Sequence, residues 1–304
     1  MLANWPKSCC NTYLKIKVSS PWRRSDPERL RRIAARIQHR FRHLRRRHRI
    51  VRRVYLANLP WPAIQALDKD IPVVIPIAAV EQHGHHLPVY TDSLLLGEVV
   101  RRSETAAGDR ALFAPLQWLG NSDHHIDYPG TVSASPRLYL DLLRDLAENL
   151  LRHGFKRILF LNGHGGNIIP AKQAIFELRQ KYRDRSDLLL LFASYWDLAK
   201  PHKDREGYVQ QDMGHACEWE TSMILTLAPQ LVVGDVTTLE TVPTGYAFDP
   251  AYRGWITKER TPSGHIGSPQ HATTGKGEHL FAAFSGGVEN FLAQITSWDG
   301  HSWL

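Results

Sequence analysis

The sequence predicts a three-layer α/β/α domain in which a mainly parallel sheet lies between two layers of helices. Three largely apolar segments carry this prediction, at residues 73–80, 157–161 and 188–193. Apolar runs of this length without polar alternation are typical of strands that are buried on both faces, as in parallel sheets. Segments with helical periodicity separate these strands, and this alternation is typical of α/β folds. The chain of 304 residues is long enough to bury a full core.

The segments around these strands alternate between helical and strand patterns. Helices are indicated by apolar residues at four-residue spacing, as at Leu138, Leu142 and Leu146, with Gly154 where this helix would end. The Gly- and Pro-rich segment 243–277 has weak patterning. The expected elements, in chain order, are a short strand at 54–59, a helix at 60–67, a strand at 73–80, a helix at 93–107, a strand at 111–116, a helix at 136–153, a strand at 157–161, a helix at 170–182, a strand at 188–193, a helix at 223–227 and a helix at 276–296.

Basic charge is concentrated at the N-terminal end of the chain. Residues 1–53 hold 17 Lys and Arg against only Asp26 and Glu28, whereas the remaining residues hold 21 basic and 28 acidic side chains. The net charge of +8 therefore belongs to this segment, and the acidic body gives no sign of binding nucleic acid. We expect a basic, partly helical N-terminal extension at 1–53 and one α/β domain at 54–304.

The extension contains a basic amphipathic helix from about Ser25 to Ile50, because apolar residues recur at helical spacing among arginines. Four interpretations are open. The segment docks weakly on the body or on a neighbouring subunit, or it is upstream sequence included by an early start codon. Alternatively it contacts an anionic surface such as a membrane or RNA, or it has a targeting role. The absence of a long apolar core argues against a secretory signal peptide.

The composition is globular and indicates neither a membrane span nor a disulfide framework. Hydrophobic residues make up 43% of the chain, and no apolar run approaches the ~20 residues that a transmembrane helix needs. The cysteines are Cys9, Cys10 and Cys217, too few for a disulfide scaffold. We therefore expect a cytoplasmic, reducing location.

Residues that can bind a metal follow three of the predicted strands. Because the carboxyl ends of parallel strands meet at one edge of a sheet, these side chains can converge. Mixed carboxylates and imidazoles suit Zn, Mn or Fe(II), and two such ions held by a bridging carboxylate deprotonate water for hydrolysis. The simpler alternative is a set of polar loops with satisfied histidines. The residues are Glu81, His83 and Asp92 after the strand at 73–80, His164 after the strand at 157–161, and His215, Glu218 and Glu220 after the strand at 188–193.

The glycines around His164, in Asn162-Gly163-His164-Gly165-Gly166-Asn167, allow backbone to approach a ligand or metal closely. A glycine-rich turn between a strand and a helix is also able to cradle phosphate. The chain lacks the Lys-Ser/Thr of a P-loop and the GxGxxG pattern, which argues against nucleotide binding.

With these motifs in this order, the sequence resembles the creatininase family of metal-dependent amidohydrolases, in the subgroup with the Asn-Gly-His-Gly-Gly-Asn motif. The resemblance spans about residues 54–295 and excludes the basic extension. The stretches that carry it are Glu81-Gln82-His83-Gly84 with Thr91-Asp92, His125 with Tyr128-Pro129-Gly130-Thr131, the motif at 162–167, and Gly214-His215-Ala216-Cys217-Glu218-Trp219-Glu220-Thr221-Ser222.

The resemblance implies a site for two divalent metal ions (Zn, Mn or Fe) per chain. Its ligands would be Glu81, His83, Asp92 and His164, with Asp92 bridging the ions. In creatininase proper a further carboxylate follows the motif histidine by two residues, where this chain has Gly166.

Two residues of the later motif complete the site that the resemblance implies. Many relatives with the Gly-Gly pattern carry a glutamate in the later motif, so Glu218 is expected to replace the missing carboxylate as a metal ligand and catalytic group. His215 matches the catalytic histidine of the family, a proton donor to the leaving nitrogen.

His125 and Trp196 are candidates for contact with the substrate, the alternatives being loop packing for His125 and a core position for Trp196. Trp196 resembles the aromatic residue that covers the substrate in creatininase, whereas about where creatininase has a second such tryptophan this chain has Gln211.

Other polar residues near these motifs are expected to support the site or the fold. Glu220 orients a ligand, caps the following helix, or binds metal. His85 and His86 are expected as loop groups or as groups that support the ligands. Cys217 is expected to be a buried structural thiol.

These inferences together predict an amidohydrolase that cleaves a non-peptide C–N bond through a metal-activated hydroxide. The substrate would be a small cyclic amide such as creatinine, a formamide or a short modified peptide. The alternative is a non-catalytic, metal-stabilised binding or scaffold member of the family. The resemblance also implies a ring-shaped, hexamer-like homo-oligomer.

Overall fold

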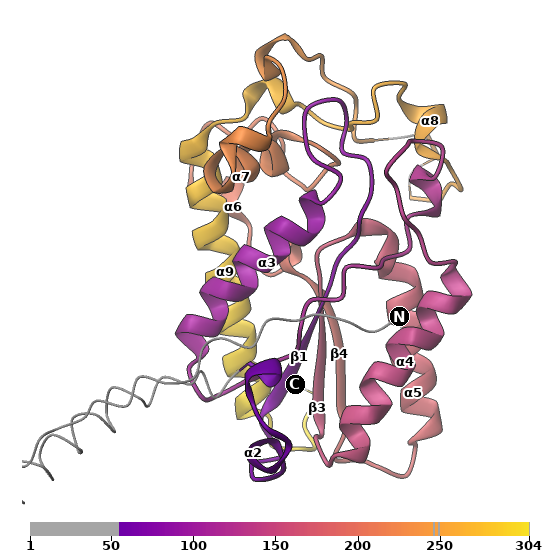
Figure 1. Ribbon diagram of the computed structural model, residues 1–304, viewed down its shortest axis with the longest axis vertical. Coiled ribbons are helices and arrows are strands. Elements are labelled where there is room, and N and C mark those ends of the chain that lie inside the picture. Colours follow the sequence, from indigo (N-terminus) through magenta and orange to yellow (C-terminus); the bar gives the residue numbers. More distant parts are fainter. Residues whose placement is uncertain (1–54, 246, 249, 304) are drawn as a thin grey trace, which may run out of the picture. The chain divides into compact units, whose positions relative to one another are not determined.

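The computed structural model describes residues 55–245, 247–248 and 250–303 (Figure 1). The predicted N-terminal extension at 1–53 lies outside these described residues. Among them, a parallel sheet runs in the order β2-β1-β3-β4. The sheet therefore confirms the predicted α/β fold class. Its strands are β1 (Pro72–Ile77), β2 (Leu112–Phe113), β3 (Arg157–Asn162) and β4 (Leu189–Ser194).

Helices cover both faces of this sheet. In Figure 1, α4 (Pro136–Arg152) and α5 (Ile168–Lys181) lie on one side of the strands. On the other side lie α3 (Thr91–Ala107), α7 (Glu218–Leu227) and α9 (Thr274–Ser297). The result is the three-layer α/β/α arrangement that the sequence predicts.

The interior positions of β1 and β3 are apolar because both faces of these central strands are buried. In β1, Val73 packs into the core shared with α4 and α5, and Val74 packs into the opposite core with α3, α7 and α9. In β3, Ile158 and Leu159 divide between the two cores in the same way. Successive side chains of a strand point to opposite faces, so a strand between two layers needs apolar residues at every position.

The register of the sheet sets the level at which the strands end. Ile77 at the end of β1 pairs with Asn162 at the end of β3, which in turn pairs with Ser194 at the end of β4. The segments that follow these three strands therefore leave the sheet at the same edge, where ligands bind in open α/β sheets.

Short helices and 3-10 turns connect these elements. None of the described helices is long and apolar enough to span a bilayer. The short elements are η1 (Leu56–Asn58), α2 (Trp61–Gln65), η2 (Asp123–His125), η3 (Gly165–Asn167), η4 (Tyr195–Asp197), α6 (Pro201–Asp204), η5 (Pro229–Leu231), η6 (Val236–Thr238), α8 (Thr257–Arg260) and η7 (Pro269–His271).

Several predicted elements have other bounds in the structure, and the strand expected at 111–116 is reduced to Leu112–Phe113. The expected strand at 54–59 is reduced to one bridge between Tyr55 and Phe113, because the chain turns at η1. The helix expected at 223–227 begins at Glu218 instead. Its first turn places Trp219 four residues before Met223 in the core, and the carboxylates of Glu218 and Glu220 interact favourably with the helix dipole.

Candidate active site

The carboxyl end of β1 leads directly into the first group of candidate ligands. Glu81 and His83 follow the strand, and Asp92 lies in the first turn of α3. These three side chains are buried, and the buried His164 follows the neighbouring strand β3. Because β1 and β3 end at paired residues, the sheet gathers four of the predicted ligands at one edge.

Asp92 lies between two histidines, with one histidine at each carboxylate oxygen. Its Oδ1 is 3.0 Å from His83 Nε2, and its Oδ2 is 3.0 Å from His164 Nδ1. Glu81 Oε1 lies 3.3 Å from His164 Nδ1, and Glu220 Oε1 lies 3.7 Å from His83 Nε2. Two groups of donor atoms therefore share Asp92.

The far nitrogen of each of these rings donates a hydrogen bond to a backbone carbonyl. His83 Nδ1 is 3.1 Å from Glu81 O, and His164 Nε2 is 2.9 Å from Asn121 O. A carbonyl oxygen only accepts hydrogen bonds, so the far nitrogens carry the protons of the neutral rings. In the neutral form that binds a metal ion, each ring would therefore present the lone pair of the nitrogen that faces Asp92, which is the orientation of metal-binding histidines.

The carboxylates of the cluster also fit a metal ion. Glu81 Oε2 and Glu220 Oε2 are buried, and neither accepts a hydrogen bond from any described residue. A buried carboxylate oxygen without a partner is costly unless a cation balances it. The donor set of carboxylates and imidazoles is one that Zn, Mn or Fe(II) binds.

Burial and charge act against each other in this cluster. Burial opposes protonation of His164, but Glu81 and Asp92 outweigh burial and raise the pKa of His164 to about 10. Burial likewise opposes ionisation of Asp92, yet His83 and His164 hold the pKa of Asp92 well below its ordinary value. The carboxylates that favour a proton on the rings would equally favour a metal cation in its place.

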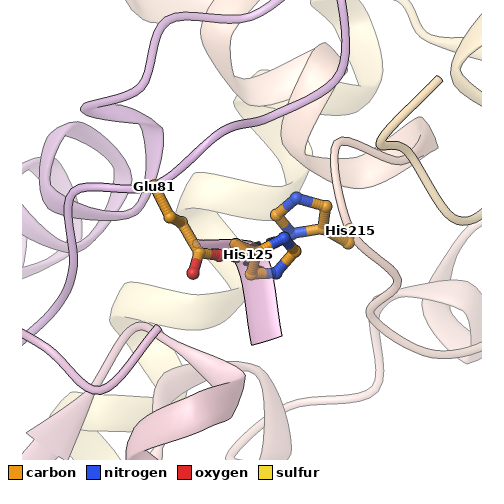
Figure 2. A group of neighbouring side chains, drawn as sticks. All are labelled: Glu81, His125 and His215. Atoms are coloured by element: carbon orange, nitrogen blue, oxygen red, sulfur yellow. Dashed lines mark ion pairs between the residues drawn. The ribbon is translucent and has the colours of Figure 1, made fainter. Parts of the chain in front are cut away.

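His215 and His125 form a second pair of rings beside Glu81 (Figure 2). Their ring centroids are 4.3 Å apart, and His215 Nδ1 and His125 Nε2 each lie 3.5 Å from Glu81 Oε1. Burial lowers the pKa of both rings well below the ordinary value, so both are neutral near pH 7. A neutral imidazole is able to take up and release a proton during hydrolysis.

The backbone on either side holds His215 in this position. His215 N donates to Ile266 O at 2.8 Å, and Ile266 N donates to His215 O at 2.7 Å. The next residue, Ala216, has a φ of 48°, a left-handed conformation that is rare for residues other than glycine. Strained backbone of this kind is characteristic of functional sites.

The structure places Glu218 away from the cluster, and this corrects the expectation that it supplies the missing carboxylate. Glu218 is fully buried, its Oε2 accepts from the backbone amides of Val209 and Gln210 at 3.0 and 2.8 Å, and its Oε1 is paired with Lys276. Its carboxylate is therefore already satisfied by other groups. The neighbouring Glu220 is the one that reaches His83.

An open cavity of about 860 Å³ gives access to the cluster. Its wall contains Glu81, Asp92, His164 and Glu220, together with His215. His125 and Trp196, expected on the substrate side, also line this cavity.

The wall of the cavity includes residues that the sequence analysis did not select. The ring of His124 lies edge-on to the ring of Trp255, with 5.1 Å between their centroids, and the guanidinium carbon of Arg260 lies 4.9 Å from the centroid of the same tryptophan ring. Tyr252 also lines the cavity. The His124-His125 pair was a signal for His124, whereas the weak patterning of 243–277 held no signal for the others.

His85, His86 and Cys217 lie outside the cluster of candidate ligands. His85 is exposed, and His86 Nε2 is 3.0 Å from Thr221 Oγ1. Neither belongs to the groups of described residues that could hold a metal. Cys217 is fully buried, and burial raises the pKa of its thiol to about 12, which leaves it uncharged.

Comparison with known proteins supports one family. The creatininase family model (creatinine amidohydrolase) matches residues 57–292. Creatinine amidohydrolase of Pseudomonas putida is 28% identical over 79% of this chain and 96% of its own length. Mycofactocin precursor peptide peptidase of Mycolicibacterium smegmatis is 30% identical over 71% of this chain and 81% of its own length.

Solved structures agree with the sequence comparison. A crystal structure of creatinine amidohydrolase (creatininase) has a TM-score of 0.68 and 27% identity, over 81% of this chain and 98% of its own. A manganese form of creatininase has the same TM-score and 28% identity, over 81% and 99% of the two chains. With the family model matching most of its length, the chain belongs to the creatininase family of hydrolases.

Proposed function

We propose that this protein is an amidohydrolase with a dinuclear metal centre. The observation that carries the proposal is the position of Asp92, whose two carboxylate oxygens each lie 3.0 Å from a different histidine. A carboxylate placed in this way is suited to bridge two ions. The creatininase relatives include a manganese form and a Zn–Zn form, which supports divalent ions of this kind here.

The donor atoms divide into two sets. Glu81, Asp92 and His164 would hold one ion, and His83, Asp92 and Glu220 would hold the other. Ions bound there would polarise the carbonyl of the substrate and lower the pKa of a water molecule. Glu220 thus takes the role of metal ligand that was expected of Glu218.

His215 is the residue of this chain that would move the proton. Its neutral ring turns Nδ1 toward Glu81, and both residues line the cavity. In this position His215 accepts a proton from the attacking water and then donates it to the leaving nitrogen when the C–N bond breaks.

The cavity favours a substrate larger than a small cyclic amide. Its volume of about 860 Å³ is in the upper part of the ~300–1,000 Å³ range of sites for drug-sized ligands. Trp196, Tyr252 and Trp255 line it, and such rings pack against extended apolar groups. Among creatinine, formamides and short modified peptides, we therefore favour a short modified peptide. The relatives named as mycofactocin precursor peptide peptidases support this choice.

The test of this function removes the bridging carboxylate. Asp92→Ala should lose both bound metal and hydrolysis of the substrate panel, which contains creatinine, N-formyl amines and short peptides. Asp187→Ala is the matched control, since Asp187 pairs with Arg185 at the surface. Metal analysis and product detection by mass spectrometry give the two readouts. An Asp92→Ala protein that kept both metal and activity would refute the assignment.

The non-catalytic alternative rests on the lack of a carboxylate at Gly166, and in the proposed ligand set Glu220 supplies that carboxylate. The cytoplasmic location and the ring-shaped homo-oligomer are still inferences from composition and from family resemblance.

A further inference from the structure

Gln82 stands between Glu81 and His83 in sequence, and its side-chain amide is held by two backbone groups. Gly84 N donates to Gln82 Oε1 at 2.9 Å, and Gln82 Nε2 donates to Gly264 O at 2.8 Å. Because a backbone N–H only donates and a carbonyl only accepts, these two contacts determine the orientation of the amide. Gln82 is 5% exposed, so its hydrogen bonds are shielded from water.

The glycine at position 264 permits this contact. Gly264 has a φ of +82°, and a Cβ there would lie only 2.1 Å from Gln82 Oε1. A side chain at this position would therefore displace the amide.

The second hydrogen of the amide determines the tautomer of His125. Gln82 Nε2 lies 2.7 Å from His125 Nδ1, so this ring nitrogen accepts the hydrogen bond. A neutral ring then carries its proton on Nε2, the nitrogen that lies 3.5 Å from Glu81 Oε1. His125 consequently presents a hydrogen-bond donor to the site.

The backbone of the same residue determines the tautomer of His215. His215 Nε2 is 2.8 Å from Gln82 O, which only accepts, so this nitrogen carries the proton. The approach of Gln82 Nε2 to His215 Nε2 at 3.0 Å then brings two donors together and is no hydrogen bond. His215 is left with the lone pair of Nδ1 directed at Glu81.

We propose that Gln82 is a positioning residue that gives the stacked rings opposite roles, His125 as donor and His215 as proton acceptor. The proposal rests on the proposed amide hydrolysis. A proton of water passes to His215 Nδ1 while the water oxygen bonds to the amide carbon, whose π electrons move to the carbonyl oxygen. The N–H of His125 stabilises this oxyanion. An electron pair of the oxyanion then re-forms the C=O bond while the C–N bond breaks, and the electron pair of the broken bond stays on nitrogen, which receives the proton from His215.

The experiment separates the side chain of Gln82 from its backbone. Gln82→Glu replaces the amide donor by a carboxylate oxygen, and Gln82→Met removes it without adding charge. Both variants retain the backbone carbonyl that holds His215, so this ring is an internal reference. The matched control is Thr257→Val, because Thr257 Oγ1 also lies 2.9 Å from His125 Nδ1. Histidine ¹⁵N NMR of the metal-free proteins reports the tautomers, and kinetics of the metal-loaded proteins reports kcat and KM.

In the parent protein we expect both rings protonated at Nε2. In Gln82→Glu, His125 should move its proton to Nδ1 while His215 is unchanged, with kcat about 10²-fold lower, the typical effect of losing one oxyanion donor. Gln82→Met should lower kcat similarly, and Thr257→Val should keep the His125 tautomer. A parent His125 protonated at Nδ1, or a Gln82→Glu protein with unchanged tautomer and kcat, would overturn the proposal.

Failure of the proposed function would be visible separately. Absence of hydrolysis of every amide by the metal-loaded parent would refute that function. The NMR spectra, which need neither metal nor substrate, would still decide whether Gln82 sets the two tautomers.

Discussion

Glu218 and Glu220 lie two positions apart in the first turn of α7, but their carboxylates have different surroundings. Glu218 pairs with Lys276 of α9, whereas Glu220 lies near His83. At about 100° per residue, side chains two positions apart on a helix diverge by roughly 200°. One carboxylate therefore stabilises the packing of α7, and the other faces the cavity.

This difference predicts opposite results for two matched substitutions. Glu220→Gln should lower the metal content from two ions per chain toward one and leave the folded protein intact. Glu218→Gln should keep both ions but reduce the free energy of unfolding by roughly 3 kcal/mol, because it leaves the Lys276 ammonium without its carboxylate. Metal analysis after dialysis and denaturant unfolding are the measurements. Loss of metal from Glu218→Gln with full metal content in Glu220→Gln would instead show that Glu218 is the ligand.

At the scale of elements, the turn between β3 and α5 connects three strand ends. Asn162 Nδ2 donates to Ser194 Oγ at the end of β4, and Asn167 Nδ2 donates to Ala78 O beyond β1. Between them, His164 receives its orientation from Asn121 O. The two asparagines of the motif thus have a structural role, which leaves the histidine to the site.

Gly166 is needed in this turn because of close approach. A Cβ at this position would lie 2.0 Å from Asn121 O and 2.5 Å from His164 Nε2. The space that a carboxylate side chain would need is occupied by the carbonyl that orients His164. The absence of a ligand at position 166 is therefore built into the packing of the turn.

The adjacent glycines provide a matched pair for testing this turn. Gly166→Ala should weaken metal binding by about 10–100-fold, the usual effect of disturbing a group that orients a ligand. Gly165→Ala should bind metal as the parent does, since a Cβ there meets no described atom within 4 Å. Metal titration with a competing chelator measures the affinities. Equal affinity of the two variants would contradict the role given to Gly166.

At the scale of the whole molecule, charge and chemistry are segregated along the chain. The 17 basic residues of segment 1–53 precede a body with an excess of acidic residues. Every residue assigned to the proposed site lies between Glu81 and Gly264, and the family match begins at residue 57. The proposed ligands therefore all lie within the part of the chain that the family model matches.

Removal of residues 1–53 is expected to leave metal content, kcat and KM unchanged, because the proposed ligands and proton carriers all remain. Any affinity for anionic vesicles or RNA should belong to the full chain alone and fall steeply with salt, as expected of contacts made by Lys and Arg. Kinetics and co-sedimentation at two salt concentrations compare the two proteins. Loss of hydrolysis on removal would show that the segment contributes to the site, and equal co-sedimentation would exclude it as an electrostatic anchor.

The sequence by itself determined the fold class, the family and four proposed ligands, Glu81, His83, Asp92 and His164. These features are local: apolar runs define buried strands, and metal-type residues follow them directly. Parallel strands then bring their carboxyl ends together without further information.

Only the tertiary structure placed Glu220 beside His83 and Glu218 beside Lys276, because each of these pairs joins residues far apart in sequence. It also placed Trp255 in the wall of the cavity and Gln82 between His125 and His215. These contacts join residues far apart in sequence, so they depend on how loops pack against one another. No pattern within a short segment records such packing, and for this reason the geometry of the site had to come from the folded chain.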